Sequence, residues 1–72
     1  MKEEIIDNIT NYVIKNYGKF PELGNDAKYY AFCRWIFIRP DNMSVDDTFQ
    51  IFDNEIYPVV KTRIGISENN TL

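Results

Sequence analysis

Residues 26–38 read DAKYYAFCRWIFI, and the secondary structure of this stretch decides the fold. If the stretch is a helix, its apolar side chains form two stripes on nearly opposite sides. The first stripe comprises Tyr29, Phe32, Cys33 and Ile36, and the second comprises Ala27, Ala31, Trp35 and Ile38. Because a helix that is apolar on both sides is typical of the centre of a small bundle, this interpretation predicts a helical domain.

A strand is the competing interpretation of the same stretch. Residues 32–38 are rich in aromatic and β-branched side chains, which favour strands. In a strand, however, Arg34 shares a face with Ile36 and Ile38, and this breaks the alternation expected of a half-buried strand. We therefore favour the helix.

The residues before this helix also predict a helix, followed by a loop. Residues 3–17 repeat apolar side chains with the spacing of one helical face, and their first turn is acidic, which complements the helix dipole. Gly18 suits the left-handed position that ends a helix. Residues 19–24 contain proline and glycine and predict a loop. The central helix then begins at residue 25 or 26, since Asn and Asp are both good N-caps, and stops before Pro40.

A third helix is predicted after the central one. Ser44 is a good N-cap, and Asp47 three residues later forms the acidic variant of a capping box. The apolar residues of this helix form one narrow stripe: Val45, Phe49, Phe52 and Ile56. Pro58 should end or kink the helix. The residues beyond it fit either a short fourth helix or a strand with alternating apolar side chains.

These elements predict a mainly α fold, a compact small domain of three to four short helices. A chain of 72 residues allows one domain only. We expect this single domain to span residues 1–66, and residues 67–72 to form a flexible polar tail. The alternative is a small α/β unit with strands near residues 32–38 and 60–66.

Composition argues against most catalytic chemistry. The chain has no histidine, and its single cysteine is Cys33. This excludes histidine-dependent catalysis, thiolate–imidazole pairs and nearly every zinc site. The glycines do not form a phosphate-binding loop, and no calcium-loop spacing occurs. We therefore expect no enzyme activity, no cofactor and no metal site.

The expected compartment is the cytoplasm, with no membrane association. The N-terminus reads MKEE rather than an apolar signal, and no stretch reaches the roughly 18 apolar residues of a membrane span. A single cysteine cannot form an internal disulfide. The chain is also rich in Ile, Asn, Lys and Tyr, whose codons are A/T-rich. This bias suggests a phage or mobile-element accessory factor from an AT-rich bacterium.

Aromatic residues make up 15% of the chain, more bulky apolar surface than one small core readily hides. If the bundle covers only one side of the central helix, the stripe that contains Trp35 stays exposed and binds a partner. The predicted partner-binding residues of this helix are Ala31, Arg34, Trp35, Ile38 and Arg39. A central helix buried on both sides is the alternative, and a fully buried Trp35 would end the idea.

The acidic third helix suggests a second contact surface. Asp46, Asp47 and Asp53 lie on its polar side, in a chain whose net charge is −3. Carboxylates along a rigid helix can imitate DNA phosphates and occupy a basic groove on another protein. A plain solvated face is the alternative interpretation.

The expected function is therefore a small non-enzymatic protein–protein interaction domain. It would bind and modulate a larger bacterial protein, or associate with itself. The alternative is a small nucleic-acid-binding regulator, because Lys28 and Arg34 are interleaved with Tyr29, Tyr30 and Trp35, as on a surface that stacks single-stranded bases. An acidic chain does not favour this alternative.

Overall fold

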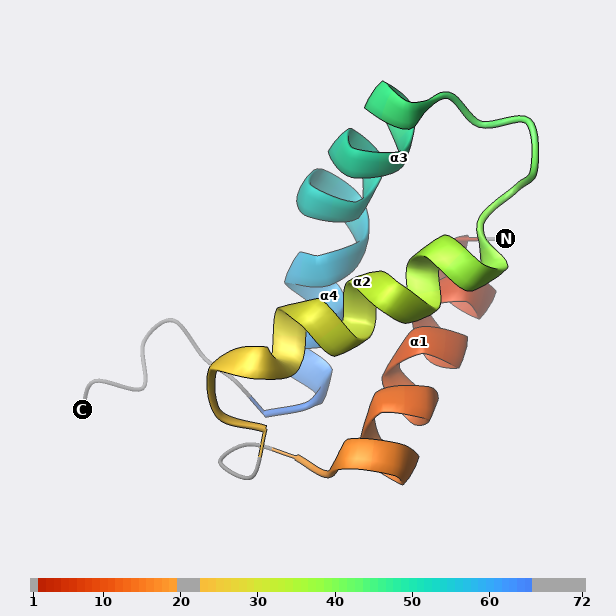
Figure 1. Cartoon of the computed structure of the whole chain (residues 1–72). Coiled ribbons are helices and arrows are strands. Elements are labelled where there is room, and N and C mark those ends of the chain that lie inside the picture. The colour runs from red at the N-terminus through yellow and green to blue at the C-terminus, as the bar shows by residue number, and fades with distance from the viewer. Residues whose placement is uncertain (1, 20–22, 66–72) are drawn as a thin grey trace.

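The computed structural model (Figure 1) describes residues 2–19 and 23–65 and shows a mainly helical small domain. Within these ranges every regular element is helical, which confirms the predicted fold class. In chain order the elements are α1 (Lys2–Tyr17), the 3-10 turn η1 (Gly24–Asp26), α2 (Ala27–Ile38), α3 (Val45–Ile51), the π-helical segment η2 (Phe52–Ile56) and α4 (Tyr57–Arg63).

The alternative fold with two strands is not formed in the described residues. The first candidate strand, residues 32–38, lies inside α2, and residues 60–63 of the second lie inside α4. Both segments pack as helices because α1, α2 and α4 contact one another and share one core. Residue 66 and the predicted tail, residues 67–72, lie outside the described residues.

The helix ends follow local sequence signals. Gly18 has a φ of 98°, the left-handed conformation expected after α1. Arg39 is extended, with φ −63° and ψ 159°, because Pro40 disfavours the helical region for the residue before it. The backbone N–H of Asp47 donates to Ser44 Oγ at 3.1 Å, which confirms the predicted cap of α3. Asp26 occupies the N-cap of α2 without a capping hydrogen bond from its side chain, since η1 already leads the chain into the helix.

The core lies where α1, α2 and α4 meet. Two alanines of α2, Ala27 and Ala31, are buried there, and their small side chains let the neighbouring helices come close. Leu23 closes the core from the chain segment before α2. The other buried apolar residues are Ile6, Ile9, Val13, Trp35, Phe52, Ile56, Val60 and Ile64.

Buried side chains recur at every fourth residue along α3, η2 and α4 and at the residue that follows α4. They are Thr48, Phe52, Ile56, Val60 and Ile64. An ideal α-helix has about 3.6 residues per turn, so a four-residue repeat would drift by roughly 160° over four steps. In η2 the turn is wider, with the N–H of Tyr57 donating to the carbonyl of Phe52. The π segment therefore helps to keep both ends of this stripe facing the core.

The predicted end of the third helix at Pro58 coincides with the change from η2 to α4, and the chain stays helical through it. Proline lacks an N–H group, so it fits best where the hydrogen-bond pattern of a helix changes. Residues 57–63 thus form the short fourth helix rather than a strand.

The predicted apolar stripe of the third helix is only half correct. Phe52 and Ile56 are buried, but Val45 and Phe49 are exposed, and Thr48 takes the buried position in α3. The Thr48 hydroxyl donates to the carbonyl of Ser44 at 2.7 Å. This hydrogen bond lets the polar side chain lie among apolar residues without an unpaired hydroxyl.

Trp35 connects α2 to α3 and is 1% exposed. Its indole Nε1–H donates to the carbonyl of Thr48 at 2.9 Å, a buried contact. Both parts of this side chain are thus used, the ring for packing and the N–H for a hydrogen bond.

Replacing Trp35 should therefore destabilise the domain. We expect Trp35→Ala to cost about 3–5 kcal/mol, a large share of the roughly 5–15 kcal/mol that holds a typical domain folded. Trp35→Phe keeps a ring and should cost about 1–3 kcal/mol, because the carbonyl of Thr48 still accepts from the N–H of Phe52. Urea unfolding followed by circular dichroism measures both, and an unchanged midpoint for Trp35→Ala would contradict the packing described.

Thr10 is a buried polar residue of α1, 5% exposed, whose hydroxyl has no hydrogen-bond partner among the described residues. Desolvating a hydroxyl without a partner costs about 1–3 kcal/mol in proteins. Thr10→Val keeps the branched shape and removes the hydroxyl, so we expect the free energy of unfolding to rise by about 1 kcal/mol. Thr62→Val is the matched control, because the hydroxyl of Thr62 is exposed and donates to the carbonyl of Pro58. A lower unfolding midpoint for Thr10→Val would refute this account.

Candidate functional site

The stripe of α2 that was predicted to bind a partner faces the core. Trp35 and Ala31 are buried, so the expectation that they form an exposed contact surface is wrong. The reason is that α1 and α4 pack against this side of α2, and the indole of Trp35 reaches the carbonyl of Thr48. Ile38 is half-buried and packs against the same core.

Arg39 has a local structural contact. Its guanidinium donates to the carbonyl of Met43 at 3.0 Å and lies near the carbonyl of Pro40. The side chain thus braces the turn between α2 and α3 and stays half-buried.

The opposite side of α2 is exposed and apolar. We call it the outer face of α2 and define it by Tyr29, Cys33, Ile36 and Phe37. Phe37 is 77% exposed and Tyr29 is 67% exposed, and Cys33 carries a free, exposed thiol. Three of these residues, Tyr29, Cys33 and Ile36, belong to the first stripe, so the structure exposes most of the stripe that was expected to be covered.

A groove borders the outer face of α2 on the side of α3. Its walls are aromatic, because the rings of Phe32 and Phe49 stack with centroids 5.2 Å apart. The ring of Phe52 forms the floor and lies edge-on to that of Phe32, with centroids 5.0 Å apart. Tyr29 forms the rim, and the groove has a volume of about 360 Å³. Phe49, 50% exposed, extends the apolar surface onto α3.

A second groove, of about 310 Å³, lies between α1 and α2. Tyr17 and Tyr30 stack face to face with centroids 3.8 Å apart, and Tyr12 lies edge-on to Tyr17. The guanidinium of Arg34 lies over the ring of Tyr12 at 4.5 Å and near that of Phe37 at 5.2 Å. Both sides of the outer face are therefore flanked by ordered aromatic side chains.

The cations of α2 flank the outer face and are bound by side chains of neighbouring elements. Lys28 Nζ pairs with Asp53 at 3.3 Å across the α3 groove, and Arg34 Nε donates to Asn8 Oδ1 at 2.9 Å on α1. A hydrogen bond with the Cys33 thiol raises the pKa of Tyr29 above its ordinary value. The outer face itself contains no Asp, Glu, Lys or Arg side chain.

The acidic residues of the predicted second surface are exposed but do not act together. Asp46 and Asp47 occupy the first turn of α3, where they complement the helix dipole, and the N–H of Asp47 is bound by the Ser44 cap. Asp53 lies in η2 and pairs with Lys28. Over residues 2–19 and 23–65, no three acidic or cysteine side chains converge as metal ligands would.

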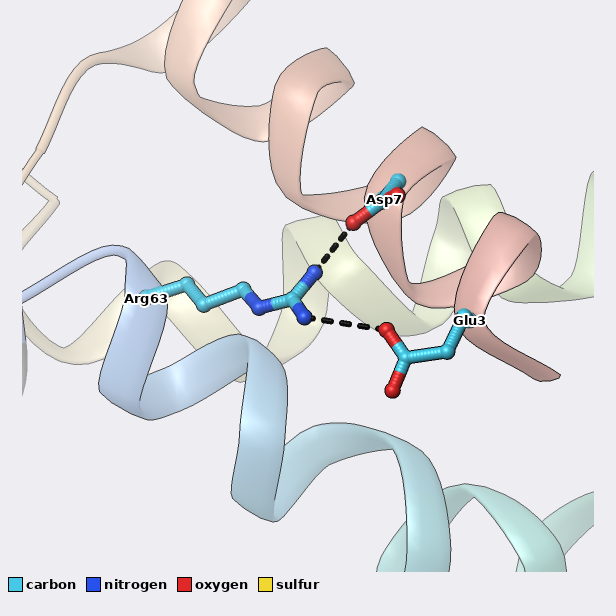
Figure 2. Close-up of polar contacts among 3 residues, drawn as sticks. All are labelled: Glu3, Asp7 and Arg63. Carbon is cyan, nitrogen blue, oxygen red and sulfur yellow. Dashed lines mark hydrogen bonds and ion pairs between the residues drawn. The ribbon is translucent and has the colours of Figure 1, made fainter.

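A cluster of three charged side chains lies elsewhere, between the first turns of α1 and the last turn of α4. Arg63 of α4 donates to both Asp7 and Glu3 of α1, the latter at 3.1 Å (Figure 2). These hydrogen bonds, first that to Asp7, raise the pKa of Arg63. All three side chains stay in contact with solvent, so the cluster holds α1 and α4 together rather than forming a reactive site.

Comparisons of this chain with protein-family models, with curated proteins and with solved structures found no match. Among the helices of the described ranges, none is both long and apolar enough to cross a bilayer.

Sequence reasoning missed Phe37 and Phe49 as surface residues. Phe37 was part of neither stripe of α2, and this position outside both stripes was the available signal. The pair Ala27 and Ala31 was a second signal, because small residues four apart mark a side where helices approach closely.

The outer face should add little to the stability of the monomer. We expect Phe37→Ser to change the free energy of unfolding by no more than about 0.5 kcal/mol, because most of the ring is already in water. Phe52→Ser is the contrasting variant, since the same residue type is buried there and its loss should cost about 3–5 kcal/mol. Urea unfolding of both variants checks this. A large loss for Phe37→Ser would make the outer face part of the fold rather than a surface.

Proposed function

We propose that this protein is a non-enzymatic interaction domain that binds another protein through the outer face of α2. The observation that carries the proposal is the exposure of Phe37 and Tyr29 on one uncharged helical surface. A small soluble domain rarely exposes two large aromatic rings next to an aromatic groove. Where it does, the exposed surface usually binds another molecule. Tyr and Phe are also enriched among residues that anchor protein interfaces.

Charge supports a protein partner over a nucleic acid. Binding to phosphates needs a set of free cations on one surface, and affinity grows with their number. Lys28 is instead paired with Asp53, and Arg34 is turned toward Asn8. The outer face between them is neutral, so it suits an apolar protein surface.

The acidic residues of α3 have a smaller part in this proposal. Asp46 and Asp47 lie in the turn of α3 next to Val45, an exposed apolar side chain. They would form a polar rim and speed the approach of a basic partner rather than supply most of the affinity. The origin of the chain as a phage or mobile-element accessory factor remains a prediction from its composition.

Affinity capture with matched variants tests the proposal. Immobilised wild-type protein is exposed to a lysate of an AT-rich bacterium and, separately, to a second tagged copy of itself. Phe37→Glu should lower recovery of the bound protein at least about tenfold, because it places a charge at the centre of an apolar contact. Gln50→Glu adds the same charge at an exposed position on α3 and should leave recovery unchanged.

The result that contradicts the proposal is equally definite. If Phe37→Glu and wild type recover the same proteins in the same amounts, the outer face is not the binding surface. If instead the protein shifts oligonucleotides at low salt and this binding is lost in Arg34→Gln, the nucleic-acid alternative replaces it.

A further inference from the structure

We infer that the partner of the outer face is a second copy of this chain, bound with its α2 antiparallel to the first and a two-fold axis near Cys33. The inference rests on the proposed function and adds the identity of the partner. Three observations on the described residues lead to it: the spacing of the exposed side chains, the placement of the grooves and the placement of the charges.

The exposed side chains are spaced symmetrically about Cys33. Tyr29 lies four residues before it and Phe37 four residues after it, and both are exposed. When two identical helices pack antiparallel about a two-fold axis, residues at equal distances on either side of the axis meet. An axis at Cys33 thus brings Phe37 of each copy onto Tyr29 of the other.

The groove beside α3 lies where that contact needs space. Its rim is Tyr29, and its walls are the stacked rings of Phe32 and Phe49. Phe37 projects from the other end of the same face and is the most exposed of the large apolar residues described. In the antiparallel arrangement each copy therefore supplies one projecting ring and one aromatic groove, and both contacts form twice.

The charges of α2 are compatible with a second copy. Identical residues meet at a two-fold axis, so a charge at the centre would repel its own copy. Cys33 lies at the centre instead, while Arg34 is held against Asn8 and Lys28 against Asp53. The antiparallel arrangement also brings Lys28 of one copy toward the negative end of α2 in the other.

The exposed area predicts a reversible dimer. An aromatic side chain buries roughly 150–250 Å² when covered, so the rings of Tyr29, Phe37 and Phe49 supply on the order of 300–500 Å² per copy. A standard interface buries about 800 Å² per partner, and the neighbouring Ile36 and the groove rims must supply the rest. We therefore expect a micromolar rather than a nanomolar dissociation constant.

Sedimentation equilibrium with charge-exchange variants tests the arrangement. Wild type is expected to pass from monomer to dimer between about 1 µM and about 1 mM. Tyr29→Lys and Phe37→Glu should each weaken the dimer at least about tenfold, because each buries an unpaired charge. Mixing the two variants should restore association, since a mixed dimer has one Lys–Glu pair and one native Phe–Tyr contact. Gln50→Glu is the control and should dimerise like wild type.

The thiol of Cys33 reports the position of the axis. A disulfide needs Cα atoms about 4.4–6.8 Å apart, which only residues close to a two-fold axis satisfy. With copper-phenanthroline and oxygen as the oxidant, two Cys33 thiols lose two electrons and two protons and form an intermolecular disulfide. Wild type should crosslink rapidly, and Cys33→Ser/Gln50→Cys, whose thiol lies on α3, should not.

The outcomes separate this inference from the proposed function. A wild type that stays monomeric at about 1 mM, or a dimer that mixing of the charge variants does not restore, overturns the antiparallel dimer. The proposed function survives that result if Phe37→Glu still abolishes capture of a different protein. The proposed function fails as well if Phe37→Glu changes neither self-association nor the capture of other proteins.

Discussion

The indole of Trp35 is the contact on which the orientation of α2 depends. Packing of the ring against the core and donation of its N–H to the carbonyl of Thr48 are satisfied together only when this side of α2 faces inward. This orientation of α2 about its own axis places Ala27 and Ala31 where the helices cross and turns Phe37 outward. The exposed aromatic surface is therefore a direct consequence of how the core is filled, rather than a separate feature added to the fold.

Local signals predicted the elements well because each depends on a few neighbouring residues. Gly18, the Ser44 cap and Pro40 all act through their own backbone geometry. The orientation of α2 was not predictable in the same way, since both of its sides are apolar and only tertiary packing chooses between them. The side of α2 predicted to be exposed is consequently the buried one. Contacts such as Arg63 with Glu3 join residues far apart in the chain, so no short-range pattern indicates them.

The surface separates apolar and charged regions, and this separation bears on the proposed interaction. Cations on α2 are bound by side chains of neighbouring elements, which leaves the apolar centre neutral. The acidic groups of α3 lie outside that centre. A surface with a neutral centre and a polar rim favours association by apolar contact. On such a surface the shape of the grooves, rather than charge, would determine which partner fits.

The contact of Arg63 with α1 has a consequence for how the domain opens. Helix ends normally fray first, because their terminal backbone groups lack partners. Here the first turns of α1 and the last turn of α4 are joined by one guanidinium. Fraying of either end breaks the contact that Arg63 makes with the other, so local opening at the two ends is coupled through this side chain.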